Sequence, residues 1–409
     1  RGTSRPMHWS SWFLAVALTI WLVAKGWESY IGYRDASLPD DLLSLPHPRR
    51  IPPSNNFWMA DMFNNDIDNN YNDTNNRSNF FHDPRRKKKD VEAIPDGCRF
   101  PYEWQQTSFP DCNRVHEIDL KQHLQINYHH DQHHHHQQQQ SDAMEYYIRS
   151  GLWRDVFSIR PDDNISVVIK LMKVEHDVDE RNLDRHRRDA LTMERLTASP
   201  HVVDIYGFCG NTVLTEQAVM GLDERVKHGR LSIQQTIQWA LEAARGVAAL
   251  HSLDIIHADL QTQQFLLDTQ GRVKINDFNR CRFLPRNNAS LEICPIGIPS
   301  APGLWRAPEE YAGQLLVQAM DVYSLGNVIH ELLVGHRPFM GLGASQVKHN
   351  IQNGVRPEIE TNDDLSQKLV ELIYECLAHD VDKRIPADKL VQELEALVDI
   401  SKSDRQKER

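Results

Sequence analysis

The sequence predicts an α+β fold in which a small strand-rich region precedes a larger helical one. Between residues 145 and 216, apolar β-branched stretches typical of strands alternate with one helical stretch, and the connections are short. From residue 233 a long segment has the apolar spacing of a helix. We therefore expect a two-lobed packed domain over residues 145–399, followed by a polar tail at 400–409.

Each expected element follows from its own pattern. The segment 167–170 is a β-branched strand that ends on a lysine, and residues 182–198 have helical character. Two strands, 202–208 and 212–216, are joined by a Cys-Gly turn. The helix 233–252 carries its apolar positions on one stripe: Ile237, Ala240, Leu241, Ala244, Val247, Ala248 and Leu250.

Composition excludes several classes of protein. The chain has 409 residues, of which 40% are hydrophobic and 25% charged, close to globular averages, so a wholly disordered, fibrous or multi-span membrane protein does not fit. The 46 Lys and Arg residues are outnumbered by 57 Asp and Glu residues, which gives a net charge of −11. Because nucleic-acid binders are usually basic, we expect no nucleic-acid partner.

The segment before the domain contains an apolar run and a polar tether. Residues 9–24 carry no charge and are flanked by tryptophans, which predicts a transmembrane or signal-anchor segment rather than a core helix. Residues 26–142 are too polar and proline-rich to bury a core, which predicts a largely disordered tether. We therefore expect a single-pass membrane protein.

The cysteines and glycosylation sequons indicate on which side of the membrane the domain would lie. Cys98 and Cys112 are spaced to close a small disulfide loop within an aromatic-rich, ordered element, and Cys281 with Cys294 is a second candidate pair. Asn-x-Ser/Thr sequons begin at Asn72, Asn76, Asn164 and Asn288. Together with the apolar run, these features favour a luminal or extracellular domain, and the cytosolic side stays open.

Two segments carry the chemistry, His-Ala-Asp-Leu-Gln-Thr-Gln-Gln at 257–264 and Asn-Asp-Phe-Asn at 276–279. They resemble the catalytic loop His-Arg-Asp-Leu-x-x-x-Asn and the Asp-Phe-Gly motif of the eukaryotic-type protein kinase superfamily, at that family's separation. Arg-Ala-Pro-Glu at 306–309, the helix motif at 321–326 and a late arginine, Arg384, follow in the family's order. The resemblance implies a bilobal protein kinase-like fold in which Arg384 pairs with Glu309.

The resemblance also implies ATP and Mg²⁺ as cofactors, with a role for each matched residue. Lys170 would hold nucleotide phosphates, Asp277 would bind Mg²⁺, and Asp259 would orient the attacking hydroxyl. The remaining cofactor-binding residues carried over from the family are the helix acid that pairs with Lys170, the surviving glycine of the glycine-rich loop, two hinge residues beside the adenine and a second metal ligand: Asp189, Gly151, Glu216, Val219 and Gln264.

Departures from the family pattern bear on activity. Arginines stand at two of the three loop glycines, Arg149 and Arg154, and Gln261 replaces the catalytic-loop lysine. The metal-binding asparagine is Gln264, and Ala258 replaces the arginine that commonly pairs with a phosphorylated activation loop. We expect a slow kinase that acts on protein hydroxyls. Two alternatives stay open: a pseudokinase scaffold, and a secretory-pathway kinase acting on a glycan hydroxyl.

Overall fold

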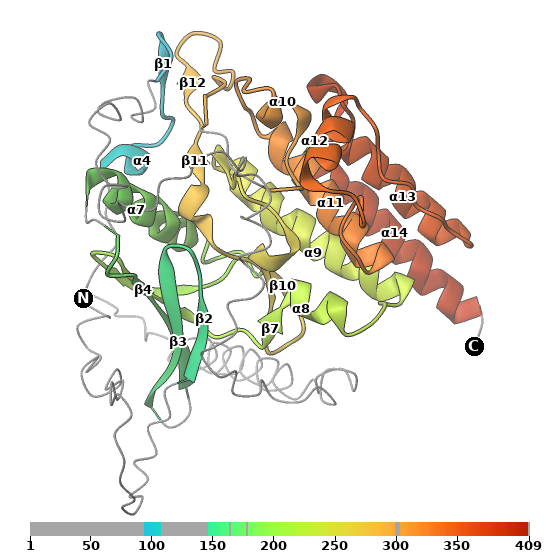
Figure 1. Ribbon diagram of the computed structural model, residues 1–409, viewed down its shortest axis with the longest axis horizontal. Coiled ribbons are helices and arrows are strands. Elements are labelled where there is room, and N and C mark those ends of the chain that lie inside the picture. Colours follow the sequence, from blue (N-terminus) through green and yellow to red (C-terminus); the bar gives the residue numbers. More distant parts are fainter. Residues whose placement is uncertain (1–93, 108–145, 163–164, 177–178, 299–302, 408–409) are drawn as a thin grey trace, which may run out of the picture. The chain divides into compact units, whose positions relative to one another are not determined.

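The fold is described from a computed structural model over residues 94–107, 146–162, 165–176, 179–298 and 303–407 (Figure 1). Every element described below belongs to one compact unit. The apolar segment 9–24 and most of the tether 26–142 lie outside the described residues.

The expectation of a single-pass membrane protein is corrected here. Among the residues that the structure describes, no helix has the length and apolar character needed to cross a bilayer. The apolar segment behind that expectation, residues 9–24, is not among them. The assignment of the domain to the luminal or extracellular side is withdrawn with it.

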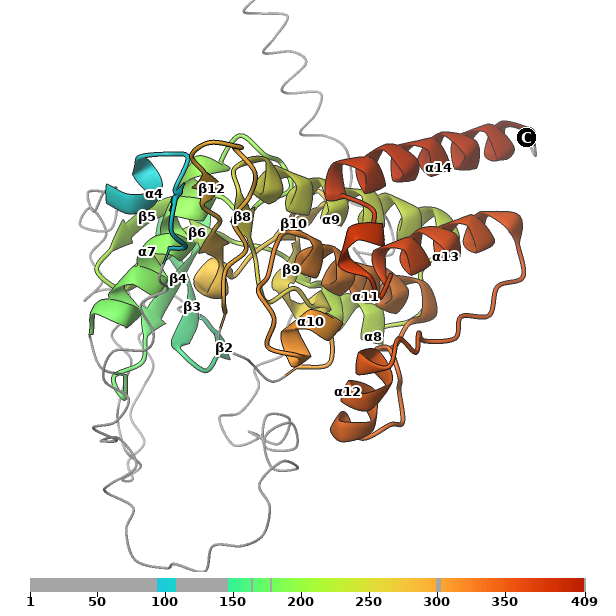
Figure 2. The same ribbon diagram turned by 90° about the horizontal axis from the view of Figure 1, so that it is seen from above.

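The strand-rich region is a five-stranded antiparallel sheet of order β2-β3-β4-β6-β5 (Figure 2). Its strands are β2 (Tyr146–Ser150), β3 (Arg154–Asp162), β4 (Ile165–Met172), β5 (Ile205–Cys209) and β6 (Thr212–Glu216). Ile159, Val167, Ile169 and Leu214 form a buried cluster within it. Branched apolar side chains pack well on a pleated surface, which explains why these stretches become strands.

The helix of this region is α7 (Glu180–Arg195), which packs against β5. It begins at Asp179, whose side chain accepts a hydrogen bond from the Asn182 N–H at 2.7 Å and so caps the first turn. Its inner face buries Ala190, Leu191 and Met193, and also the charged Asp189. A buried carboxylate needs a partner, and Arg154 of β3 forms an ion pair with Asp189.

The helical region is built around α11 (Ala319–Val334), which is buried along most of its length. The helices packed with it are α9 (Ile233–Ser252) and α13 (Asp364–Cys376), and α14 (Ala387–Lys407) lies along α9 (Figure 2). Gly326 allows close contact between α11 and α13, because an added Cβ would lie 2.7 Å from the Cys376 Cβ. The expected domain boundary at residue 399 falls inside α14.

Shorter elements complete this region. They are α8 (Leu222–Lys227), α10 (Pro308–Tyr311), α12 (Ala344–Gln352) and the 3-10 turn η4 (Val381–Lys383). Two small sheets carry the segments with the catalytic motifs: β7 (Met220–Gly221), β9 (Phe265–Leu267) and β10 (Val273–Ile275) in one, and β8 (Ile255–Ile256) with β11 (Arg282–Phe283) in the other. The 3-10 turns η2 (Thr262–Gln264) and η3 (Phe278–Arg280) connect them. The motif residues therefore lie on short, hydrogen-bonded connections.

Residues 94–107, which we call the N-terminal clasp, precede the expected two-lobed domain and pack against it. Its strand β1 (Cys98–Arg99) pairs with β12 (Arg286–Asn287), and its helix α4 (Trp104–Thr107) lies beside α7 in both views (Figure 1, Figure 2). The Trp104 ring packs edge-on against Phe283 at 5.2 Å, and the Arg195 guanidinium lies over its face at 5.1 Å. The clasp thus touches both α7 and the segment that follows the Asp-Phe-Asn motif.

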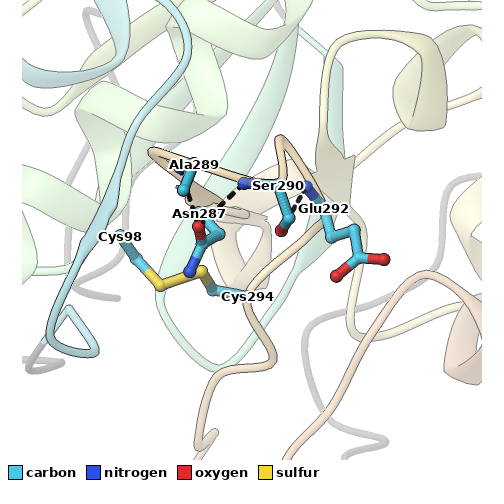
Figure 3. The surroundings of a disulfide bond; sticks show 6 residues. All are labelled: Cys98, Asn287, Ala289, Ser290, Glu292 and Cys294. Carbon is cyan, nitrogen blue, oxygen red and sulfur yellow. Dashed lines mark hydrogen bonds between the residues drawn. A yellow bond between two sulfur atoms is a disulfide. The ribbon is translucent and has the colours of Figure 1, made fainter.

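A disulfide between Cys98 and Cys294 secures the clasp (Figure 3). The expected pairs Cys98 with Cys112 and Cys281 with Cys294 are therefore wrong, and Cys281 is a buried free thiol. The physical reason is that β1 pairs with β12, which brings together two cysteines 196 residues apart. Spacing along the chain favours local pairs and carries no information on such a contact.

Candidate active site

The catalytic loop is held by a single buried carboxylate. Asp321 of α11 accepts hydrogen bonds from the backbone N–H groups of His257 at 2.7 Å and Ala258 at 2.9 Å, and it also contacts His251 Nε2 at 3.2 Å. Ala258 has a left-handed backbone with φ of 61°. This turn presents the next residue, Asp259, at the surface of the loop.

Asp259 lies beside an arginine that the sequence analysis did not assign a role. Arg306 Nη2 donates to Asp259 Oδ1 at 2.6 Å, and Arg280 Nε lies 3.9 Å from the same oxygen. The other end of the Arg306 guanidinium donates to the Ala258 carbonyl at 2.9 Å and to Glu310 at 3.2 Å. The Asp259 side chain remains 21% exposed. It is thus a positioned carboxylate with one oxygen engaged and access to solvent.

Lys170 is hydrogen-bonded to Asn276, the residue directly before Asp277. The Lys170 ammonium donates to Asn276 Oδ1 at 2.7 Å, and Asp277 follows directly in the chain with φ of 63°. Burial lowers the pKa of Lys170, against the opposing charges of Asp189 and Asp277. Burial, together with the negative charge of Asp189, raises the pKa of Asp277. The Asn279 amide donates to the Asp277 carboxylate. A cation bound here would favour the ionised form of Asp277.

Asp189 is placed as expected but has a different partner. The side chain is fully buried, and Arg154 of β3, instead of Lys170, forms its ion pair. It also accepts the Phe278 N–H at 2.8 Å, which ties α7 to the Asp-Phe-Asn motif. Burial alone would raise the pKa of Asp189, but the charges of Arg154 and Lys170 hold it below its usual value. The helix acid is therefore ionised and paired with an arginine from a former glycine position.

The expected hinge residues, Glu216 and Val219, form hydrogen bonds within the protein. The Glu216 carboxylate accepts from Lys274 Nζ at 2.5 Å and from the Asp204 N–H at 2.8 Å. The Val219 N–H donates to the Leu267 carbonyl at 2.8 Å, while its side chain is 41% exposed. An adenine ring at this position would therefore use other backbone groups of the hinge and the exposed Val219 side chain.

The other two expected cofactor-binding residues, Gly151 and Gln264, each form a backbone hydrogen bond. The Gly151 N–H donates to the Arg154 carbonyl at 2.8 Å, and a Cβ at residue 151 would make an ordinary contact of 3.5 Å with that carbonyl. Gln264 is buried, and its carbonyl accepts the Asn276 N–H at 2.9 Å. Gln264 is thereby linked to the Lys170 and Asp277 segment through the backbone.

These residues fit a nucleotide with its metal ion. Two donors of the Arg154 guanidinium, Nε and Nη2, are buried without a hydrogen-bond partner, and phosphate oxygens are suitable acceptors. Within the described part of the chain, no three His, Cys, Asp or Glu side chains gather around a metal position. Mg²⁺ would therefore depend on Asp277, the Gln264 amide and the phosphates themselves, as is usual for this ion.

The ion pair expected beyond the site is present. Arg384 donates to both oxygens of Glu309, at 2.5 and 2.7 Å, and both side chains are buried. The contact of Arg306 with Asp259 and the pairing of Arg154 with Asp189 were not predicted from the sequence. Both residues were visible as arginines, one directly before Ala-Pro-Glu and one in a glycine position, but their partners follow only from the folded geometry.

Comparison with known proteins also indicates a protein kinase domain. A family model described as protein kinase domain matches residues 148–394, more than half of the chain. The chain is 28% identical over 259 residues to the probable serine/threonine-protein kinase drkC of Dictyostelium discoideum, which covers 61% of this chain and 32% of that protein. It is 29% identical over 231 residues to the serine/threonine-protein kinase PknA of Corynebacterium glutamicum, which covers 54% and 48%.

A third relative is a putative serine/threonine-protein kinase/receptor, R818, of Acanthamoeba polyphaga mimivirus, 28% identical over 247 residues. The alignment covers 59% of this chain and 14% of that protein. The matched part is thus less than half the length of each of these three relatives. With the motif geometry described above and the match over residues 148–394, the chain belongs to the protein kinase domain family.

Proposed function

We propose that this protein is an ATP-dependent protein kinase that transfers the γ-phosphate of Mg-ATP to a serine or threonine hydroxyl of a protein substrate. The observation that carries the proposal is the placement of Asp259, a partly exposed carboxylate on a loop whose backbone is bonded to Asp321. The choice of serine or threonine rests on the names of the relatives.

Each residue would contribute positioning or charge, which is what phosphoryl transfer requires of the protein. Bound Mg-ATP supplies the phosphoryl group. Asp259 would orient the acceptor hydroxyl and accept its proton, and Lys170 would hold the phosphates. Asp277 would hold Mg²⁺, with Gln264 as a weaker second donor, and the hinge from Glu216 to Val219 would bind adenine.

Slow turnover is part of the proposal. The Arg306 guanidinium engages one oxygen of Asp259 at 2.6 Å, so only the second oxygen is available to a hydroxyl. Gln261 supplies no positive charge for the transferred group, and loss of one such stabiliser typically costs about 10²–10³ in rate.

One specific observation favours the pseudokinase as a second candidate. Both catalytic carboxylates already have side-chain partners, Arg306 on Asp259 and Asn279 on Asp277. These contacts would stabilise the fold without any turnover. The glycan acceptor remains a prediction, since no contact among the described residues distinguishes a sugar hydroxyl from a protein hydroxyl.

The test is phosphate transfer from labelled Mg-ATP by the full chain, to itself and to a protein mixture. We expect slow transfer that is lost in Asp259→Asn, a variant that keeps the size of the side chain and removes its basic oxygen. Asp223→Asn, a change on α8, is the matched control and should leave transfer unchanged. Folded wild-type protein that transfers no phosphate would refute the proposal and support the pseudokinase.

A further inference from the structure

Arg154 occupies a position where a small residue is expected and where its charge is costly to bury. It is the first residue of β3, at the third glycine position of the family's loop, and only 6% of its surface is exposed. Arginine is rarely this buried unless it is paired. The Asp189 ion pair accounts for one end of the guanidinium.

The strand register directs Arg154 toward the nucleotide site. In the β3–β4 pair, Val156 lies opposite Lys170, so these two side chains share a face of the sheet. Arg154 is two residues before Val156, and side chains alternate along a strand, so it projects from that same face. Lys170 and Arg154 are thus neighbouring cations, and both influence the ionisation of Asp277.

The Arg154 guanidinium has hydrogen-bond donors that the ion pair with Asp189 does not use. Its Nη1 group is bonded to Asp189, while Nε and Nη2 are buried without a hydrogen-bond partner. Buried donors without partners are rare in folded proteins and usually indicate a ligand or a functional role. The planar fork of arginine matches the oxygens of a phosphate, and the helix acid holds the group in place.

We propose that Arg154 is a phosphate-binding residue of the nucleotide site. It replaces Lys170 in the ion pair with α7 and directs its two remaining N–H groups to phosphate oxygens. This inference rests on the proposed function, because it requires that a nucleotide binds beside Lys170 and Asp277. It adds a positive charge to a site whose second metal donor is the amide of Gln264.

The extra charge has a measurable consequence. A nucleotide triphosphate normally relies on Mg²⁺ to neutralise its oxygens, and Arg154 beside Lys170 supplies part of that neutralisation from the protein. Nucleotide binding should therefore survive removal of divalent metal, and Arg154 should be the residue on which this metal-free binding depends.

The experiment titrates the full chain with a fluorescent ATP analogue, with Mg²⁺ and with excess chelator. Arg154→Gln removes the charge but keeps a donor for Asp189, and Arg154→Lys restores the charge without the fork. The matched control is Arg160→Gln, an exposed arginine on the same strand. Thermal unfolding of each variant reports whether it is folded.

We expect Arg154→Gln to weaken metal-free binding about ten- to hundredfold, the range of a charge-assisted hydrogen bond or two, with a smaller loss in Mg²⁺. Arg154→Lys should recover part of the loss, and Arg160→Gln should bind like the wild type. Asp189→Asn removes the ion pair and keeps the guanidinium, so it should weaken binding less than Arg154→Gln.

Four results would overturn the inference. Unchanged affinity in Arg154→Gln would show that its donors are not used, and tighter binding would show that the arginine obstructs the site. Equal losses in Arg154→Gln and Asp189→Asn would show a structural pair only. If Arg154→Gln does not fold, wild-type affinity in Arg154→Lys also refutes the inference, because the lysine lacks the two extra N–H groups.

The inference and the proposed function fail separately. Phosphate transfer by wild-type protein together with unchanged affinity in Arg154→Gln would remove the inference and leave the kinase. Absence of nucleotide binding to folded wild-type protein would remove both.

Discussion

The disulfide between Cys98 and Cys294 should contribute a large share of the stability of the fold. The bond closes a loop between residues 196 positions apart. Restricting the unfolded chain over a loop of that length corresponds to about 5 kcal/mol in the chain-entropy model, and measured losses for native disulfides are about 2–5 kcal/mol. Even halving the length of this loop would change the value by only about 0.6 kcal/mol.

The perturbation is Cys98→Ser, Cys294→Ser and the double variant, each in the full chain. We expect each to lose about 2–5 kcal/mol in the free energy of unfolding, measured by urea denaturation followed by far-UV circular dichroism. The clasp contacts through Trp104 and the β1–β12 pairing remain in all three variants, so the loss should come from the cross-link. The two single variants and the double variant should therefore coincide, since each removes the same bond.

Two results would refute this reasoning. A loss below about 1 kcal/mol would show that restricting the unfolded chain through this bond contributes little to stability. Additive losses in the double variant would show that each serine acts through its own local packing and that the cross-link contributes little.

Three further predictions concern the interior. Arg384→Met removes the bidentate partner of the buried Glu309 carboxylate. Urea denaturation should therefore show that the free energy of unfolding falls by about 3–5 kcal/mol. A decrease under about 1 kcal/mol would contradict a buried charge at residue 309. Asp321→Asn weakens the anchor of the catalytic loop, so kcat for phosphate transfer should fall about tenfold or more with little change in KM, and an unchanged kcat would argue against that anchor. Burial lowers the pKa of His330 to about 4, so the folded state keeps it neutral while the unfolded state takes up a proton as pH falls through 6.5. Stability should therefore decrease toward acid, and between about pH 8 and 5 the wild type should lose about 2 kcal/mol more than His330→Gln; equal losses would refute the burial argument.

Motif order was enough to predict the kinase fold and the segments of the site. Asp259, as the candidate catalytic residue, and Arg384, as the partner of Glu309, could be named from the sequence because the family's motifs have particular residue types at particular separations. Local patterns of apolar and β-branched residues likewise predicted strands at 167–170, 202–208 and 212–216, and the spacing of apolar residues predicted a helix at 233–252.

Pairings between distant segments could not be predicted in this way. Lys170 and Asp189 were recognised separately, yet only the sheet register shows that Arg154 projects from the same face as Lys170 and reaches the helix acid first. The partner of Asp259 could not be predicted either, because Arg306 lies 47 residues further along the chain.

The amino-acid sequence by itself determined the family, the order of the elements and the types of residue in the site. The tertiary structure decided which charges meet, Arg154 with Asp189 and Arg306 with Asp259, and which cysteines pair, Cys98 with Cys294. The physical reason is that periodicity and motif spacing are local properties of the chain, whereas an ion pair or a disulfide depends on the relative placement of strands and helices that fold from separate segments.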